Sequence, residues 1–254
     1  MLSDQQVEQF IEEGYVTIPA AFSRDIADQC KELLWQDLDV QRDDPSSWIH
    51  PVIRLGEKTD SAFVLSANSE TLITAYKQLA HQNWISRTSM GTFPIRFPSK
   101  TIPTDIGWHV DASYGVKLED FMDWRINMFS RGRALLMLFL YSDVNKEDAP
   151  TLLQCGSHLE VARTLKAYGH KGLSFLELAE HIPEPSNFQR RAATGEAGTV
   201  YLCHPFLVHA AQKHEGTSPR FMAQPPLLSK NDFDITHPLC PIEIAIANGL
   251  NAAS

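Results

Sequence analysis

The second part of the chain consists of short apolar runs that turn-forming residues interrupt at close intervals. From about residue 90 onward, these runs are rich in aromatic and branched side chains and occupy residues 92–97, 134–144, 199–210 and 221–228. Proline, glycine and aspartate break them, as they do between neighbouring strands of an antiparallel sheet. This pattern limits the fold more than any other feature of the sequence, and it predicts an antiparallel β core.

The first part of the chain carries helix signals instead. Ser3 followed by Gln6 has the form of a capping box, and apolar residues then recur at helical spacing until Gly14 ends the helix. A short strand is expected over residues 15–18. Further helices are expected over residues 23–38, 69–80, 158–166 and 174–181.

A helical layer followed by many strands is typical of the α+β class. The core that we expect is a double-stranded β-helix, the jelly roll also found in cupins, with an N-terminal helical layer against it. No internal repeat or low-complexity linker divides the chain, so residues 1–254 are expected to form a single domain.

The composition excludes several classes of partner. The formal net charge is -9 and the basic residues are scattered, so a nucleic-acid backbone would be repelled over most of the surface. No apolar segment reaches the roughly 18 residues that a membrane span needs, so no membrane partner is expected. The N-terminus lacks the basic and apolar regions of a signal peptide, which predicts a cytoplasmic protein. We expect a monomer or a small homo-oligomer.

The cysteines indicate neither a zinc knuckle nor a disulfide scaffold. They are four in number, lie far apart and form no C-x-x-C pair. We therefore expect reduced and mostly buried thiols, which agrees with a cytoplasmic protein.

The stretch "GWHVDASYG", residues 107–115, holds the first candidate metal ligands. His109 and Asp111 lie two positions apart, so on an extended strand both side chains point to the same face. At that spacing an imidazole and a carboxylate can hold one metal ion. The dipeptide pattern alone is a weak signal.

A second stretch, "TVYLCHPFLVHAAQKHEGTSPRFMAQPPL", residues 199–227, supplies a further ligand and a fixed cation. His209 lies near the end of an expected strand, and a hairpin at Gly216 is expected to return Arg220 beside that strand. His204, five positions before His209, would face the opposite way.

The residues His109, Asp111 and His209 form the set of two imidazoles and one carboxylate that binds non-haem Fe(II) and leaves three coordination positions open. A dicarboxylate cosubstrate on that iron needs its far carboxylate held. Arg220 suits this role, because a guanidinium donates two parallel hydrogen bonds and keeps its charge when buried.

Four stretches together resemble the phytanoyl-CoA dioxygenase-like family of Fe(II)/2-oxoglutarate-dependent oxygenases. They are "FIEEGYVTIP", "WHVD", "YSDVNKEDAPTLLQCGSH" and "HAAQKHEGTSPR". The family carries H-x-D, then G-[ST]-H, then a distal histidine with an arginine eleven positions later, and this chain matches the order and the spacing. The resemblance implies Fe(II), 2-oxoglutarate and O2 as cofactors, with His109, Asp111 and His209 as metal ligands and Arg220 as the 2-oxoglutarate ligand.

The same resemblance suggests weaker candidates. Arg96 and Thr151 are further candidate contacts for 2-oxoglutarate, and Trp108, Tyr114 and Arg133 are candidates for the substrate pocket. Two family positions differ here: Ala211 stands where a hydroxyl residue is common, and His214 stands where an asparagine is common. The cosubstrate carboxylate is therefore expected to have fewer partners than usual.

The implied function is hydroxylation of a small organic molecule with release of succinate and CO2. Desaturation, epoxidation and ring formation use the same iron site and stay open. A cupin-like zinc or manganese enzyme that does not use O2 is one alternative, although it would not need Arg220. A catalytically silent jelly-roll binding module is another, although no metal ligand has been lost. Hydrolase motifs such as G-x-S-x-G and H-E-x-x-H are missing from the sequence.

Overall fold

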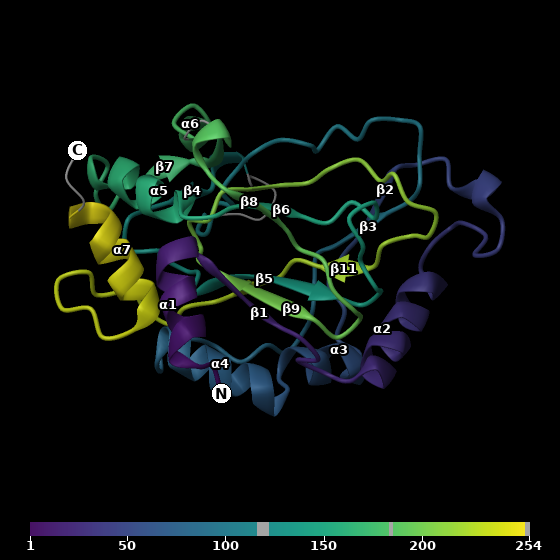
Figure 1. Cartoon of the computed structure of the whole chain (residues 1–254), viewed down its shortest axis with the longest axis horizontal. Coiled ribbons are helices and arrows are strands. Elements are labelled where there is room, and N and C mark those ends of the chain that lie inside the picture. Colours follow the sequence, from purple (N-terminus) through teal and green to yellow (C-terminus); the bar gives the residue numbers. More distant parts are fainter. Residues whose placement is uncertain (116–121, 183–184, 252–254) are drawn as a thin grey trace.

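The structure, a computed structural model, describes residues 1–115, 122–182 and 185–251. Within them, two antiparallel sheets form the centre of the molecule (Figure 1). The larger sheet has the order β1-β9-β5-β11, with β12 also paired to β5. Its strands are β1 (Tyr15–Ile18), β5 (Leu135–Leu140), β9 (Val200–Cys203), β11 (Met222–Ala223) and β12 (Pro226–Leu227). The smaller sheet, β10-β6-β8, contains β6 (Leu152–Gln154), β8 (Arg190–Ala192) and β10 (His209–Ala210).

Two short strand pairs and a set of helices surround these sheets. The pairs join β2 (Val52–Leu55) to β3 (Phe93–Arg96) and β4 (Arg125–Ile126) to β7 (Leu173–Ser174). The α-helices are α1 (Asp4–Glu13), α2 (Arg24–Gln36), α3 (Ser61–Ala67), α4 (Glu70–Ala80), α5 (Ser157–Lys166), α6 (Phe175–Ala179) and α7 (Pro241–Asn251), and the 3-10 helices are η1 (Pro45–Ser47) and η3 (Pro185–Asn187). None of the described helices is long and apolar enough to cross a membrane.

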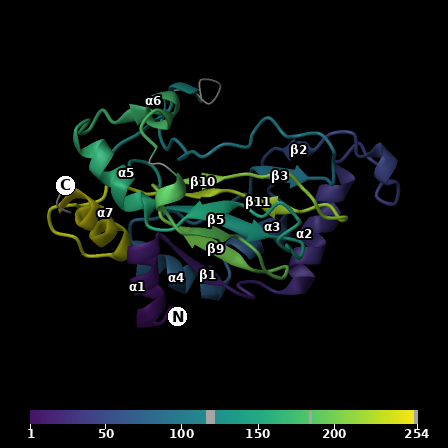
Figure 2. The same ribbon diagram turned by 45° about the horizontal axis from the view of Figure 1, so that its top comes forward.

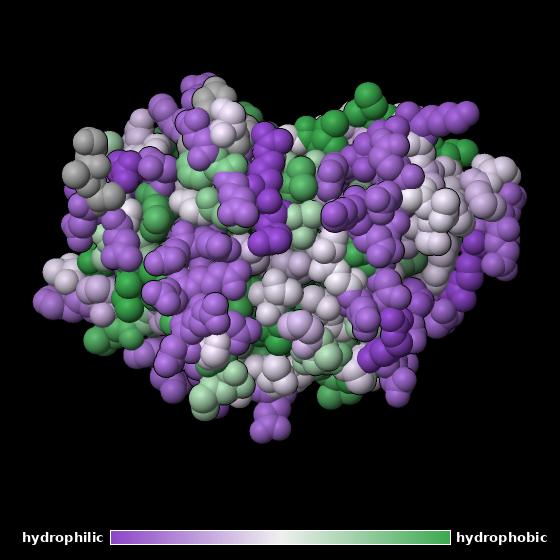
Figure 3. All heavy atoms as spheres, in the orientation of Figure 1, coloured by the Kyte–Doolittle hydropathy of each residue, from purple (hydrophilic) through white to green (hydrophobic). Residues whose placement is uncertain are grey.

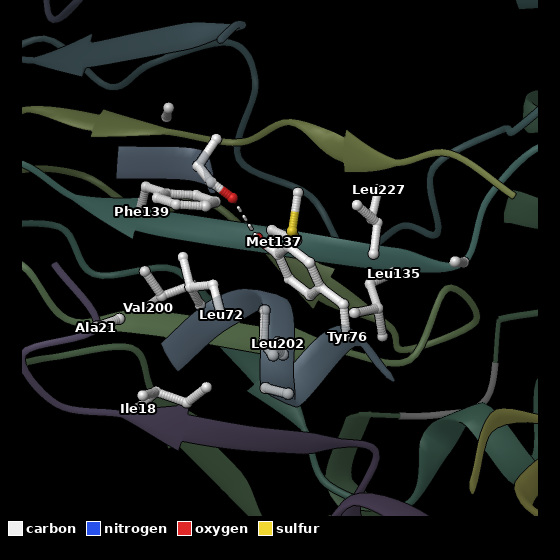
Figure 4. Close-up of a cluster of buried hydrophobic side chains, with 14 of the residues drawn as sticks. Ile18, Ala21, Leu72, Tyr76, Leu135, Met137, Phe139, Val200, Leu202 and Leu227 are labelled. Carbon is white, nitrogen blue, oxygen red and sulfur yellow. Dashed lines mark hydrogen bonds between the residues drawn. The ribbon is translucent and has the colours of Figure 1, made fainter. Parts of the chain in front are cut away.

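The side chains of β5 alternate between two hydrophobic clusters, as the two-residue period of a strand requires. The odd-numbered residues, among them Met137, pack with Leu72 and Tyr76 of α4 (Figure 4). The even-numbered residues pack with Leu153 of β6. The first cluster therefore lies between the larger sheet and the helices, and the second lies between the two sheets, which is the layering of a jelly roll.

The helix signals of the N-terminal part are confirmed. The Ser3 hydroxyl accepts a hydrogen bond from the Gln6 N–H, and the Gln6 side chain accepts one from the Ser3 N–H, which is the capping box. Gly14 ends α1 with a left-handed φ of 84°. A Cβ atom there would lie 2.5 Å from Nδ1 of His158, so glycine also permits the close approach of α5. The side chains of Ser23 and Ser69 cap α2 and α4 as expected.

Several elements were not predicted from the sequence, among them β2, α3 and α7, and also the short strands β4, β6, β7 and β8. The first two lie within residues 40–68, which showed no clear period. Helix α7 packs against α5, where the Lys166 ammonium donates to the Leu250 carbonyl at 2.9 Å, and against α1 and α4 (Figure 2). It is apolar around much of its circumference, so its sequence lacks the one-sided stripe that marks a surface helix.

The expected hairpin at Gly216 is wrong. His209 lies on β10, which pairs with β6 in the smaller sheet, whereas Arg220 precedes β11, which pairs with β5 in the larger sheet. The backbone of Arg220 bridges that of Arg96 instead. The turn signal at Gly216 predicted that the chain changes direction, but it carried no information about which sheet receives the next strand.

Candidate metal centre

Three side chains converge where the segment after residue 106 meets β10. The backbones of His109 and His209 form an antiparallel bridge, with N···O distances of 2.9 and 3.0 Å, and this bridge sets their rings 4.3 Å apart. Asp111, two residues further on, points to the same side as His109. Its Oδ1 lies 3.6 Å from Nε2 of His109 and 3.8 Å from Nε2 of His209. The three possible ligand atoms all lie within 4.8 Å of one another, so they could hold one metal ion.

Backbone carbonyls orient both imidazole rings. Nδ1 of His109 lies 2.8 Å from the Gly107 carbonyl, and Nδ1 of His209 lies 3.0 Å from the Leu207 carbonyl. A carbonyl can only accept, so each Nδ1 carries the proton and each Nε2 keeps its lone pair toward Asp111. Histidines that bind metals are held in this way by their second nitrogen.

Arg133 controls the charge of Asp111. Its guanidinium donates to Oδ2 of Asp111 at 2.9 Å and to the Ala112 carbonyl at 3.0 Å, which leaves Oδ1 to face the histidines. Burial raises the pKa of Asp111, but the charge of Arg133 and the two neighbouring imidazoles outweigh burial and lower it. Burial and the neighbouring His109 lower the pKa of His209 to about 4. The carboxylate is therefore ionised and His209 is neutral near pH 7, which are the forms that bind a metal.

A cavity of about 1000 Å³ opens onto these three residues. Residues near β2, such as Arg54, line one part of it, and residues of α6, such as Phe175, line another. The outline of the molecule is notched between these two regions, and hydrophobic side chains are visible in and beside the notch (Figure 3). The volume is large enough for a cosubstrate and a second small molecule together.

Arg220 also lines this cavity and is fully buried. Its guanidinium donates to the carbonyls of Ala149 and of Pro94, the latter at 3.0 Å. Among the described residues, no carboxylate lies within ion-pair distance of it, and its Nε has no hydrogen-bond partner. Burial, followed by the positive charge of Arg96, lowers the pKa of Arg220 to about 9. A buried cation without a counter-ion favours an anionic ligand.

The two weaker candidates for 2-oxoglutarate contact also line the cavity. Arg96 is buried beside Arg220, but its guanidinium already donates to Asp105 at 2.8 Å and to the Gln212 carbonyl at 3.3 Å. Thr151 is buried, with its hydroxyl 3.8 Å from the sulfur of Met222. Both could contact a ligand in the cavity, but the charge of Arg96 is already paired with that of Asp105.

The three candidates for the substrate pocket differ in position. Trp108 lines the cavity and carries the guanidinium of Arg190 over its ring at 5.4 Å. Arg133 lines it as well, but its guanidinium is already hydrogen-bonded to Asp111. Tyr114 is not among the described residues that line the cavity, and its hydroxyl donates to the Lys171 carbonyl at 2.8 Å.

His204 lies away from this site, but for another reason than the alternation of one strand: it follows β9 of the larger sheet, whereas His209 lies on β10 of the smaller sheet. His204 is fully buried against His158, with ring centroids 4.9 Å apart, and against Phe10 and Phe206. The expectation that His209, rather than His204, belongs with His109 and Asp111 therefore agrees with the geometry.

Two residues that the sequence did not single out lie at this site. The Gln224 side-chain nitrogen is 3.1 Å from Nε2 of His209, so its amide occupies the space in front of the lone pair that would face a metal. Arg87 lines the cavity and donates to the carbonyls of Ser89 and Pro226. Neither belongs to a motif, and the segment around Gln224 reaches the site through the pairing of β11 and β12 with β5 and through a hydrogen bond from the Gln224 N–H to the Thr92 carbonyl.

Solved structures of similar fold support this arrangement of the chain. The carbocyclase SnoK from nogalamycin biosynthesis, described as non-heme and alpha ketoglutarate dependent, has a TM-score of 0.58 at 18% identity, and the match covers 92% of this chain and 88% of that one. HygX from Streptomyces hygroscopicus, with nickel, 2-oxoglutarate and hygromycin B bound, has a TM-score of 0.54 at 16% identity, covering 88% and 86%. The epimerase SnoN, in complex with Fe3+, alpha ketoglutarate and nogalamycin RO, has a TM-score of 0.58 at 15% identity, covering 87% and 81%.

No curated protein matches the chain significantly. The family model described as Phytanoyl-CoA dioxygenase (PhyH) matches residues 10–222, a span that contains His109, Asp111, His209 and Arg220. The family expected from the four sequence stretches is thereby confirmed, and the chain belongs to the phytanoyl-CoA dioxygenase family.

Proposed function

We propose that the protein is an Fe(II)- and 2-oxoglutarate-dependent oxygenase that acts on a small organic molecule. The observation that carries this proposal is the convergence of His109, Asp111 and His209, with both Nε2 atoms directed toward Oδ1 of Asp111. Two imidazoles and one carboxylate on one face suit Fe(II) and leave positions open for a cosubstrate and O2. The similar structures that contain iron or nickel with 2-oxoglutarate support the same choice of cofactors.

The surroundings of Arg220 fit the cosubstrate. A guanidinium that is buried among carbonyls without a carboxylate partner would gain a counter-ion from the far carboxylate of 2-oxoglutarate. Arg96 lies beside it and would add a second positive charge. Thr151 is a candidate for a hydroxyl contact to the same ligand.

The chain's own residues would do three things in the reaction. His109, Asp111 and His209 would hold the metal on one face, and Arg133 would keep Asp111 ionised and oriented. Arg220 would orient the cosubstrate. The cavity walls, including Trp108, would hold the substrate near the metal and keep bulk water away. When bound, Fe(II) and 2-oxoglutarate supply oxidising power from O2, with release of succinate and CO2.

Hydroxylation is the outcome that we propose among several that share this site. The similar structures include a carbocyclase and an epimerase, so the same fold supports more than one outcome. The intact carboxylate of Asp111 opposes halogenation, in which a halide takes the place of that ligand. Which bond reacts depends on where the substrate lies in the cavity, and the residues that could decide this include Trp108 and Arg133.

We also propose that residues 1–254 form one domain that works in the cytoplasm as a monomer or a small homo-oligomer. The two sheets share one interior, and the helices pack against the larger sheet, which supports a single domain. All four cysteines are free, and three of them are buried, which agrees with a reducing compartment.

Succinate formation tests the proposal before any substrate is known. Purified protein with Fe(II), 2-oxoglutarate and air should release succinate slowly, and a library of small organic molecules should contain compounds that accelerate this release. Mass spectrometry of those reactions should then detect a product that has gained one oxygen atom. Asp111→Ala is the matched control, because it removes one ligand without touching Arg220. A protein that binds zinc tightly and never forms succinate would favour a cupin-like enzyme that does not use O2.

A further inference from the structure

The charges that line the cavity do not balance. Its lining contains five arginines and three acidic residues in the part of the chain that the structure describes, namely Arg54, Arg87, Arg96, Arg133 and Arg220 against Glu57, Asp105 and Asp111. The chain as a whole is strongly acidic, with a formal net charge of -9. An excess of positive charge in the concave part of an acidic protein raises the local concentration of anions.

Cosubstrate and metal together do not remove this excess. Fe(II) adds two positive charges and 2-oxoglutarate brings two negative charges, so the lining keeps an excess of two after both have bound. Leaving out Arg54 and Glu57, the two most exposed members, does not change the balance. A further anionic group is therefore expected in the cavity.

Arg87 is the arginine best suited to receive that group. Arg133 is engaged with Asp111, Arg96 with Asp105, and Arg220 is the proposed 2-oxoglutarate ligand. The side chain of Arg87 is only 10% exposed, and its nearest carboxylate among the described residues is that of Glu57, at 3.7 Å, which is longer than a hydrogen bond. Burial lowers the pKa of Arg87, as expected where a counter-charge compensates incompletely.

The contact of the Arg87 guanidinium with the segment 224–226 indicates how far Arg87 lies from the candidate metal centre. Its guanidinium donates to the Pro226 carbonyl at 2.8 Å, and Gln224, two residues earlier on the same extended segment, reaches Nε2 of His209. Two residues of a strand span about 7 Å. Arg87 and the metal ligands thus lie along one cavity wall, separated by roughly the length of a small organic molecule.

Much of the rest of the cavity lining is apolar. Trp108, Trp124, Phe175, Ile106, Met222 and Leu228 also line the cavity. A molecule with an apolar or aromatic body and one acidic group would match both this lining and the cation.

We propose that the cavity binds a substrate with an apolar body and one anionic group, such as a carboxylate, sulfonate or phosphate, and that Arg87 holds this anionic group. The inference rests on the proposed function, because the charge balance includes Fe(II) and 2-oxoglutarate. It goes further by naming a substrate class and the residue that selects it. Arg87 would then orient the substrate so that the opposite, apolar end faces the metal.

Two fluorescent probes test this inference without knowledge of the natural substrate. Anilinonaphthalene sulfonate carries an anionic group, and N-phenylnaphthylamine has the same aromatic framework without it. Both are titrated into protein that is saturated with Mn(II) and 2-oxoglutarate, so that the cosubstrate site is filled. We expect the sulfonate to bind at least about tenfold more tightly, because a charge-assisted hydrogen bond in a partly buried site has that effect on affinity.

Three variants connect this preference to one side chain. Arg87→Gln should remove most of the preference for the sulfonate, and Arg87→Lys should keep part of it, because the charge remains without the planar fork. Arg131→Gln is the matched control, since Arg131 pairs with Asp232 and is not among the described residues that line the cavity. If Arg87→Gln, shown to be folded by circular dichroism, retains the native preference, or if the native protein shows none, the inference is wrong.

The visible band that Fe(II) and 2-oxoglutarate give in the absence of O2 separates this inference from the proposed function. A protein that forms the band but does not prefer the anionic probe contradicts the substrate class alone. A protein that prefers the anionic probe through Arg87 but forms no band contradicts the oxygenase and leaves an anion-binding cavity.

Discussion

Two pairs of histidines lie close together in the part of the chain that the structure describes, and their surroundings differ. The rings of His109 and His209 are 4.3 Å apart, and Asp111 lies beside both Nε2 atoms. The rings of His158 and His204 are 4.9 Å apart, but aromatic side chains and backbone groups surround them. Ring proximity is therefore not what distinguishes a candidate metal centre. The carboxylate and the open cavity do that.

The difference also appears in how the second nitrogens are used. In the first pair each Nδ1 faces a carbonyl, so both lone pairs converge on one point. In the second pair Nε2 of His158 lies 3.0 Å from the Ile11 carbonyl, whereas Nδ1 of His204 accepts from the Phe206 N–H at 3.1 Å. His158 of α5 thus contacts α1 through the Ile11 carbonyl and packs against His204, which lies in the segment after β9. The two rings contribute to stability, and their lone pairs are not directed at a common ion.

The largest expected effect is that of removing the carboxylate. Asp111→Ala should lower succinate formation to background, a loss greater than the roughly 100-fold that even outer-shell partners of a metal can cost. The physical reason is that one ligand and the only anionic charge of the set disappear together. The measurement is iron content and succinate formation on folded protein. Native iron content in this variant would show that the ion is held elsewhere.

Arg220→Ala should weaken the binding of 2-oxoglutarate and leave the binding of iron unchanged. Truncating one partner of a buried, hydrogen-bonded charge pair costs about 2 to 5 kcal/mol, which is roughly 30-fold to several thousand-fold in apparent affinity. Arg220→Lys should restore only part of the affinity, because an ammonium keeps the charge without the fork. The readout is succinate formation against 2-oxoglutarate concentration, with iron assayed alongside. An unchanged KM for 2-oxoglutarate in the Ala form would indicate that Arg96, and not Arg220, holds the far carboxylate.

Lowering the pH should reduce the stability of the folded protein through the second histidine pair. Burial lowers the pKa of His158 to about 4 in the folded protein, against about 6.5 in an unfolded chain. The unfolded state therefore binds more protons between these values, so stability is retained above about pH 6.5 and lost as the pH falls toward 4. The shift corresponds to about 3 kcal/mol.

Urea unfolding between pH 7 and pH 4 measures this loss. His158→Gln removes one of the buried histidines with a lowered pKa and should reduce the pH dependence, although His204 and His209 still contribute to it and the variant lowers stability at pH 7. His50→Gln is the control, because His50 is exposed and should leave the curve unchanged. A native protein whose stability is constant over this range would contradict a buried neutral His158.

Arg133 should have the smallest of these effects on the metal. Its guanidinium contacts Asp111 but does not contribute a ligand atom, so Arg133→Gln should weaken Mn(II) binding by about 10- to 100-fold. The loss should be larger at lower pH, because without Arg133 the pKa of Asp111 rises toward ordinary values. Isothermal titration with Mn(II) at two pH values measures both effects. Equal affinities for native and variant protein would make Arg133 a substrate contact only.

The sequence predicted what short-range patterns control. Capping boxes act over three residues and the strand period over two, which is why Ser3, Gln6 and the shared face of His109 and Asp111 followed from local spacing. His209 and Arg220 lie far away along the chain and were proposed from their residue types, and the resemblance to a family supported both. The choice of His209 over His204 used the arginine eleven positions after His209 together with the alternation of a strand, although the structure places the two residues on separate segments.

Contacts that depend on packing could not be predicted in the same way. Arg133 reaches Asp111 across 22 residues, and Arg87 reaches Pro226 across 139. The hairpin at Gly216 failed because a turn signal does not specify which of two sheets the next strand joins. The hydrogen bond from the Tyr114 hydroxyl to the Lys171 carbonyl spans 57 residues and could not be predicted from local spacing either.

The measurement that tests the central claim most directly compares one residue from each histidine pair. Native protein, His209→Ala and His204→Ala are titrated with Fe(II) and 2-oxoglutarate without O2, and the weak visible charge-transfer band is recorded with the bound iron. We expect a band at one iron per chain for the native protein and for His204→Ala, provided that variant folds, and no band for His209→Ala. A band that survives in His209→Ala, or one missing from the native protein, would contradict that claim.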